Sequence, residues 1–171
     1  YGWVKEGGGE IPGFTLDTAE KHSGSQSLKL APEDEGEYVI LSSIPAEPGK
    51  SYTYSVWLKR EAAANVFFRV AAWGDAFSWA TDINGVEIMK PSGNATEDWT
   101  QYTFEIYPLN EDVENVWVQI CISGGGTAWV DDVFFGVPVE EPEPEPDDGN
   151  LLINPGFEMD GLYTDAYGWV K

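Results

Sequence analysis

Two strand-like segments carry aromatic and polar side chains at alternating positions. Arg69 and Trp73 lie in one segment, and Trp117 and Gln119 lie in the other. Apolar residues fill the positions between them, so the two pairs would share a face opposite the core if the strands are neighbours. A Trp ring stacks on the flat C–H face of a sugar, and amide or guanidinium groups bind its hydroxyls. The pattern therefore indicates glycan contact, with packing under a loop as the structural alternative.

Other aromatic residues have less defined roles. Phe77 and Trp79 fall in a predicted loop over 74–82, where they could form a wall beside such a site. Trp57 and Trp99 are expected to pack against the sheets, although the pattern leaves the face of Trp57 ambiguous.

Short alternating segments separated by Gly and Pro turns must position these residues. Strands are predicted at Ser27–Leu30, Tyr38–Ser42, Tyr52–Lys59, Val66–Trp73, Gln101–Tyr107, Val116–Ser123 and Ala128–Phe135. No segment has a convincing helical period. This pattern predicts an all-β fold, a two-sheet β-sandwich or jelly roll.

Composition narrows the class of partner. The 171 residues suffice for one domain with a hydrophobic core, and the aromatic share of 14% exceeds the usual need of one core. The net charge of -21 argues against nucleic acid and anionic membranes, because phosphate binding needs clustered Lys and Arg. A neutral partner or Ca²⁺ is compatible with this charge, which could also serve solubility alone.

The sequence offers no convincing catalytic constellation. The single cysteine, Cys121, lies in an apolar strand pattern and is expected to be a buried thiol, and His22 is the only histidine. Carboxylate pairs are plentiful, but so acidic a chain offers them by chance. We expect a protein that is not an enzyme.

The first five residues, Tyr-Gly-Trp-Val-Lys, recur at 167–171. This repeat predicts one period of a tandem array, cut inside a repeat. The expected parts are a domain at 1–136 that lacks its first strand, an acidic Pro-rich linker at 137–149, and the start of the next copy at 150–171. At ~3.1 Å per residue in polyproline II, the linker reaches ~40 Å, about the width of such a domain.

Five segments match a known pattern. They are Asn150–Glu158, His22–Leu28, Pro48–Lys59, Asp98–Tyr102 and Trp129–Val133. They resemble the opening strand, the HSGxxSL turn, two middle strands and the closing YVDDV strand of the carbohydrate-binding modules of the family 4/9/16/22 superfamily. The opening strand comes last in this chain, which agrees with the repeated pentapeptide. The resemblance implies a β-jelly roll whose concave sheet binds a glycan.

The resemblance also implies further site residues. Trp3 or Trp169 matches the position of a platform aromatic near the cleft. A structural Ca²⁺ would be held by Glu158, by backbone oxygens of the Lys21–Ser23 region, and by Asp131 or Asp132, with Asp131 favoured. The alternative is that Asp131 and Asp132 form a polar strand end without a metal.

The leading hypothesis is non-catalytic binding of a neutral plant polysaccharide or oligosaccharide, such as a β-glucan, mannan or xylan. As the resemblance implies, the module would be secreted with a glycoside hydrolase. The alternative is a structural or adhesive repeat of a bacterial cell-surface protein. Residues 151–157 could supply the missing strand in cis, which we favour and which gives a monomer, or in trans, which gives a strand-exchanged oligomer.

Overall fold

The computed structural model describes residues 3–9, 13–61, 64–75, 77–80, 96–107 and 111–137, which form β-strands and no helix. The strands are β1 Val4–Lys5, β2 Phe14–Asp17, β3 Ser27–Leu30, β4 Tyr38–Pro45, β5 Tyr52–Arg60, β6 Asn65–Trp73, β7 Phe77–Trp79, β8 Thr96–Ile106, β9 Asn115–Ser123 and β10 Ala128–Gly136. Accordingly, no helix in this part of the chain is long and apolar enough to span a membrane.

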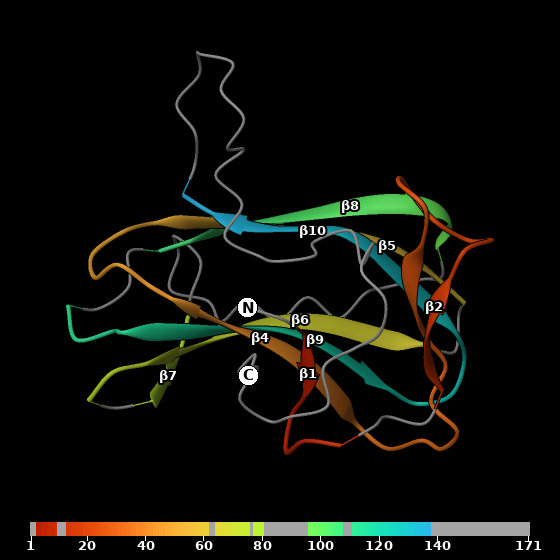
Figure 1. Ribbon diagram of the computed structural model, residues 1–171, viewed down its shortest axis with the longest axis horizontal. Coiled ribbons are helices and arrows are strands. Elements are labelled where there is room, and N and C mark those ends of the chain that lie inside the picture. The colour runs from red at the N-terminus through yellow and green to blue at the C-terminus, as the bar shows by residue number, and fades with distance from the viewer. Residues whose placement is uncertain are drawn as a thin grey trace, which may run out of the picture.

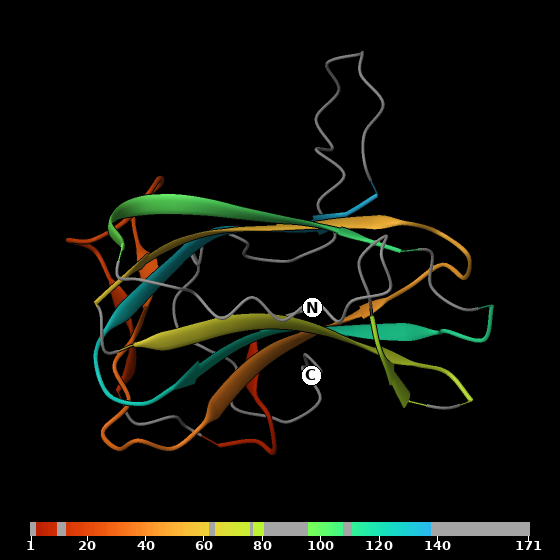
Figure 2. The ribbon, with the colours of Figure 1, turned by 180° about the vertical axis from the view of Figure 1, so that it is seen from behind.

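The strands form two antiparallel five-stranded sheets. Sheet A has the order β1-β4-β9-β6-β7, and sheet B has the order β2-β3-β10-β5-β8. The two sheets lie one above the other, with β8, β5 and β10 in one layer and β4, β9 and β6 in the other (Figures 1 and 2). The predicted all-β, two-sheet jelly-roll sandwich is confirmed.

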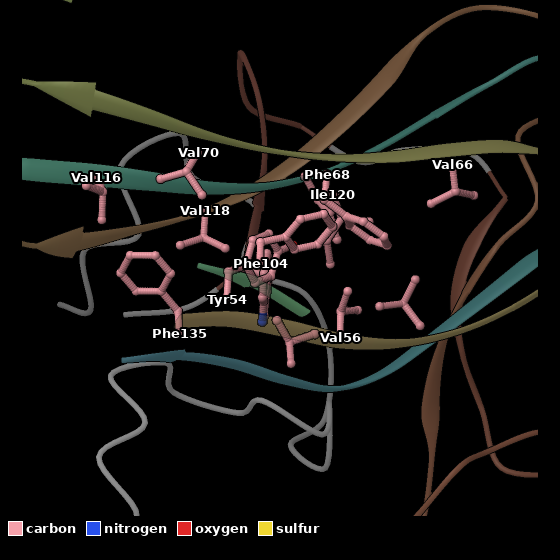
Figure 3. Close-up of a cluster of buried hydrophobic side chains, with 14 of the residues drawn as sticks. Tyr54, Val56, Val66, Phe68, Val70, Phe104, Val116, Val118, Ile120 and Phe135 are labelled. Atoms are coloured by element: carbon pink, nitrogen blue, oxygen red, sulfur yellow. The ribbon is translucent and has the colours of Figure 1, made fainter. Parts of the chain in front are cut away.

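The core lies between the two sheets. Tyr54 and Val56 of β5 meet Phe68 of β6 and Ile120 of β9 there (Figure 3). Alternation produces this layer, because successive side chains of a strand point to opposite sides and the apolar ones bury together. The remaining positions of β5, β6 and β9 therefore face outward.

Several strand boundaries differ from the predicted ones, and β4 extends to Pro45 rather than ending at Ser42. Phe77–Trp79 was expected in a loop but forms the edge strand β7, which pairs with β6. The short strands β1 and β2 were not predicted, and β8 begins at Thr96 rather than at residue 101. Strands of two to four residues contain too few positions to show a period.

The predicted linker and the predicted start of the next copy lie outside the described residues. The prediction of a tandem, permuted arrangement therefore stays a prediction.

Candidate functional site

The outer face of sheet A, called face A below, carries the predicted glycan contacts. In the pairing of β6 with β9, Arg69 lies opposite Gln119 and Ala71 lies opposite Trp117. Trp73 is two residues from Ala71 on the same side of β6. The predicted sharing of one face by Arg69, Trp73, Trp117 and Gln119 is confirmed.

Three aromatic rings gather on face A. The ring centroids of Trp73 and Trp117 are 4.8 Å apart, and those of Trp73 and Phe77 are 4.9 Å apart. Phe77 of β7 pairs with Trp73 in register and is 44% exposed. These three residues form the face A cluster, which presents aromatic surface to a ligand.

Gly74 helps to end β6 at this cluster. A Cβ on Gly74 would lie 2.0 Å from the carbonyl oxygen of Asp112, so only glycine fits this close approach. The neighbouring Glu114 N–H donates to the Trp73 carbonyl over 2.8 Å. The turn before β9 is thereby held against the end of β6, beside the aromatic rings.

Polar groups adjoin the cluster. Gln119 is only 1% exposed, yet its Oε1 has no hydrogen-bond partner, and neither has the buried Trp73 Nε1. Arg69 donates to Glu37 over 3.4 Å and lies over the Phe67 ring at 5.2 Å. An unpaired buried acceptor and an unpaired buried donor beside aromatic rings provide sites for the hydroxyls of a ligand.

The middle of face A is more buried than an open cleft would be. Outward-facing apolar residues there are 0–7% exposed, although they do not belong to the core between the sheets. They are Val4, Val39, Leu41, Ala71 and Cys121. The end of the face near β7, where the cluster lies, keeps half-buried and exposed aromatic side chains.

Cys121 is chemically quiet. Burial raises the pKa of its thiol to about 12, although the positive charge of the nearby Arg69 lowers the pKa in part. The thiol is therefore neutral at neutral pH and a poor nucleophile, as the sequence indicated.

The assignment of Trp3 to a ligand platform is corrected by the structure. Trp3 is 2% exposed and packs in the core just before β1, so its ring is not available for stacking on a sugar. Trp169 lies outside the described residues, as does the side chain of Trp79, whose backbone pairs with Ala71.

The predicted calcium region is held together by hydrogen bonds. The fully buried Asp131 accepts backbone N–H groups from His22 at 2.8 Å and from Ser23 at 3.1 Å on Oδ2, and the Asp132 N–H at 2.8 Å on Oδ1. Burial raises the pKa of Asp131, and these hydrogen bonds lower it in part. The loop after β2 is thereby joined to β10.

Asp132 completes this junction from a bulge in β10. Its backbone has a positive φ of 45°, and the register of β10 with β5 shifts at this point. Its Oδ2 lies 2.6 Å from His22 Nδ1, and its Oδ1 accepts the Ser23 hydroxyl at 2.7 Å. We call His22, Ser23, Asp131 and Asp132 the clasp.

The clasp leaves few oxygens for a metal. Ca²⁺ takes six to eight oxygen ligands, whereas hydrogen bonds already occupy three of the four lone pairs of Asp131 and two of the four of Asp132. Lys21 donates to the Thr18 carbonyl, and no group of three metal-binding side chains occurs in the described residues. The assignment of Asp131 or Asp132 to a Ca²⁺ site therefore stays a prediction, and Glu158 lies outside the described residues.

The sequence did not reveal an aromatic patch on the outer face of sheet B, called face B. The His22 ring stacks on Trp57, with centroids 3.7 Å apart and an interplanar angle of 15°, and meets Trp99 at 5.9 Å and 63°. Gln101 pairs with Trp57 in register. We call these four residues the face B patch. The odd positions of β5 could have indicated an outward Trp57, but nothing local placed His22 on it.

Trp129 has a structural role. Its Nε1–H donates to Asp17 Oδ2 over 3.0 Å, and Lys29 and Lys59 lie 5.8 Å from its ring. The ring therefore joins β10 to β2 and lies close to two lysine side chains.

Comparison with known proteins places the fold. No family model matches the chain, and no curated protein matches it. TmCBM61, solved with β-1,4-galactotriose, is similar in structure with a TM-score of 0.57 and 13% identity over 80% of this chain and 88% of the other. The C-terminal family 22 carbohydrate binding module of Clostridium thermocellum Xyn10B is similar in structure with a TM-score of 0.56 and 17% identity. This match covers 79% of the present chain and 85% of the module.

At these identities the likeness shows the fold. Family 16 and family 4 modules are also similar in structure, so three of the four families of the predicted resemblance share this sandwich. The same fold forms 19% of the enzymatically active domain of bacteriophage CBA120 tailspike protein 4, matched over 80% of this chain at a TM-score of 0.57 and 16% identity. Function must therefore be argued from the side chains of this chain.

Proposed function

We propose that this chain is a non-catalytic module that binds a neutral polysaccharide through the face A cluster, with a β-glucan, mannan or xylan as the expected class. The observation that carries this proposal is the 4.8 Å pair of Trp73 and Trp117 beside the unpaired Gln119 Oε1. The rings would stack on the C–H faces of pyranose units, and the amide oxygen would accept a hydroxyl proton. Gln119 is buried without ligand, so the hydroxyl reaches it only after neighbouring side chains shift.

Two similar structures support the ligand class. TmCBM61 was solved in complex with β-1,4-galactotriose. In the family 22 module, amino acids of a cleft have a role in ligand binding. The chain's net charge of -21 also favours a neutral glycan over an anionic one. Secretion and attachment to a glycoside hydrolase belong to the same proposal.

Calorimetric titration with soluble mixed-linkage β-glucan, galactomannan and xylan tests the proposal. The wild type should bind at least one of them, and Trp73→Ala combined with Trp117→Ala should weaken this binding by about thirtyfold or more. Tyr107→Ala is the matched control, because Tyr107 is an exposed aromatic residue, 53% accessible, outside the cluster. If the wild type binds none of the three, or if the double variant binds as well as the control, the proposal fails.

A structural or adhesive repeat is the second candidate, and the repeated pentapeptide together with the acidic Pro-rich segment at 137–149 favours it. In that case none of the glycans binds. Light scattering would then show self-association that depends on Trp117.

We propose Ca²⁺ as a structural ion near Asp131, whose buried carboxylate keeps one acceptor position. If so, Ca²⁺ at one hundred times its Kd should raise the free energy of unfolding by about 2.7 kcal/mol over the protein in EDTA. Asp131→Asn should remove this difference. Equal melting temperatures in Ca²⁺ and EDTA would contradict a calcium role.

The cis strand completion is a further part of the proposal and is supported by the repeated pentapeptide. A monomer is expected in light scattering. A stable dimer would favour strand exchange in trans.

A further inference from the structure

The face B patch lies on the opposite side of the sandwich from the face A cluster, because sheet B and sheet A cover the core from opposite sides (Figures 1 and 2). Trp57 alternates with Val56 and Leu58, which are fully buried, so Trp57 points away from the core. Gln101 pairs with Trp57 in register, and Trp99 is two residues from Gln101 on the same side of β8. The patch is therefore separate from the proposed glycan site.

The rings of this patch are fixed before any ligand arrives. The His22 ring is held on one side by the stack on Trp57 and at Nδ1 by Asp132, and the His22 backbone N–H donates to Asp131. A ligand that binds here does not have to order a loose loop, so it avoids much of the usual entropic cost.

The patch presents a corner of two rings. The outer side of the imidazole forms a floor, and Trp99 stands at 63° to it as a wall. The His22 side chain is 29% exposed, Trp57 and Trp99 are half-buried, and Gln101 is exposed. Flat aromatic surface and a free amide thus occur together at one accessible place.

This combination suits a neutral sugar. One pyranose ring can lie on the imidazole floor against Trp99, with its hydroxyls on the Gln101 amide. The Asp132 carboxylate holds the His22 ring at Nδ1, and Nε2 is a further hydrogen-bonding group for a sugar hydroxyl. The Asp132 carboxylate contacts the patch at His22, and the chain has 30 acidic against 9 basic residues, so an anionic ligand is disfavoured.

We propose that the face B patch is a second sugar-binding site, which takes one or two pyranose units of a neutral polysaccharide. Two sites on opposite faces would let one domain contact two chains, or two parts of one folded chain, of an insoluble polysaccharide. Binding to such a surface then gains from multivalency, whereas a short oligosaccharide reports each site separately.

The experiment uses the full chain and, as probes, cello-, manno- and xylo-oligosaccharides and their insoluble polysaccharides. In ¹H–¹⁵N spectra, the variants Trp57→Phe and Trp99→Phe assign the indole signals of Trp57 and Trp99. In the wild type, these signals should shift when one of these sugars is added. The same shifts should occur in the double variant Trp73→Ala, Trp117→Ala, which lacks the aromatic pair of face A. Trp99→Ala and, independently, Gln101→Ala should each weaken binding at this site by about three- to tenfold. Gln101 is exposed, so its truncation does not threaten folding.

Tyr107→Ala serves as control on the same strand layer, because Tyr107 directly follows β8 and lies outside the patch. If these indole signals stay in place with every sugar while face A binds, the second site is refuted and the proposed function stands. If neither face responds, both fail. Concentration-dependent dimers that Trp99→Ala abolishes would also overturn the proposal, in favour of a contact between copies of the chain.

Discussion

The two outer faces of the sandwich carry similar aromatic residues but hold them in different ways. On face A, Trp73 packs on Trp117 while Trp73 Nε1 and Gln119 Oε1 lack partners. On face B, four hydrogen bonds join residues 22–23 to Asp131 and Asp132, and the His22 ring is stacked. An unpaired buried group costs about 1–3 kcal/mol, whereas a satisfied network makes a region rigid. Changes on face A should thus alter binding more than stability, whereas changes at Trp57 and in the clasp should chiefly alter stability.

The largest effect on stability is expected from Trp57→Ala. It removes the ring on which His22 stacks and the apolar surface buried under it, so the free energy of unfolding should fall by about 2–3 kcal/mol. Trp117→Ala on face A removes one tilted ring contact, at 48° to Trp73, and should cost less than this. Urea denaturation of both variants measures the difference, and an equal loss would remove the contrast between the faces.

The next largest loss of stability is expected from Asp132→Ala. It deletes the acceptors of His22 Nδ1 and the Ser23 hydroxyl and places alanine at a φ of 45°, for a combined cost of about 2 kcal/mol. Asp132→Asn is the matched control, because asparagine tolerates this backbone conformation and keeps one acceptor. If both variants unfold at the same urea concentration, the clasp does not depend on Asp132 in this way.

Gln119→Leu should have a smaller effect on stability and in the opposite direction. Replacing the unpaired amide oxygen by an apolar group of similar size should leave the free energy of unfolding unchanged or raise it by up to about 1 kcal/mol. Affinity for the glycan should fall by about three- to tenfold, because the hydroxyl acceptor is lost. Gln101→Leu, on exposed face B, should change stability by less than about 0.5 kcal/mol. A clear loss of stability in Gln119→Leu would show that the amide is structural.

The smallest effect on stability is expected at Asp17, which joins β2 to Trp129. The hydrogen bond from Trp129 Nε1–H lowers the pKa of Asp17 below its ordinary value of 3.8, and burial opposes this shift. A carboxylate whose folded pKa is depressed stabilises the fold above the unfolded pKa, and this contribution is lost as the pH falls through the folded value. Asp17→Asn should therefore show a flatter loss of stability below about pH 4 than the wild type. If the melting temperatures of the two proteins fall in parallel as the pH is lowered, this role is contradicted.

Local patterns predicted the long strands and their outward residues well. Arg69, Trp73, Trp117 and Gln119 were correctly placed on one face, because the period of two in each strand assigns every side chain to a side. Short strands such as β7 escaped prediction, since three residues show no period and their pairing with β6 decides their form.

What covers a side chain was decided only by the tertiary structure. The sequence alone determined that the chain is an all-β sandwich with aromatic and amide groups on its outward strand positions. It did not determine that Trp3 packs in the core or that Gln119 is buried on face A. Nor did it place His22 on Trp57 through a clasp with Asp132, a residue 110 positions away. Periodicity describes a residue relative to its own strand, whereas burial and hydrogen bonding depend on elements that folding brings together from distant parts of the chain.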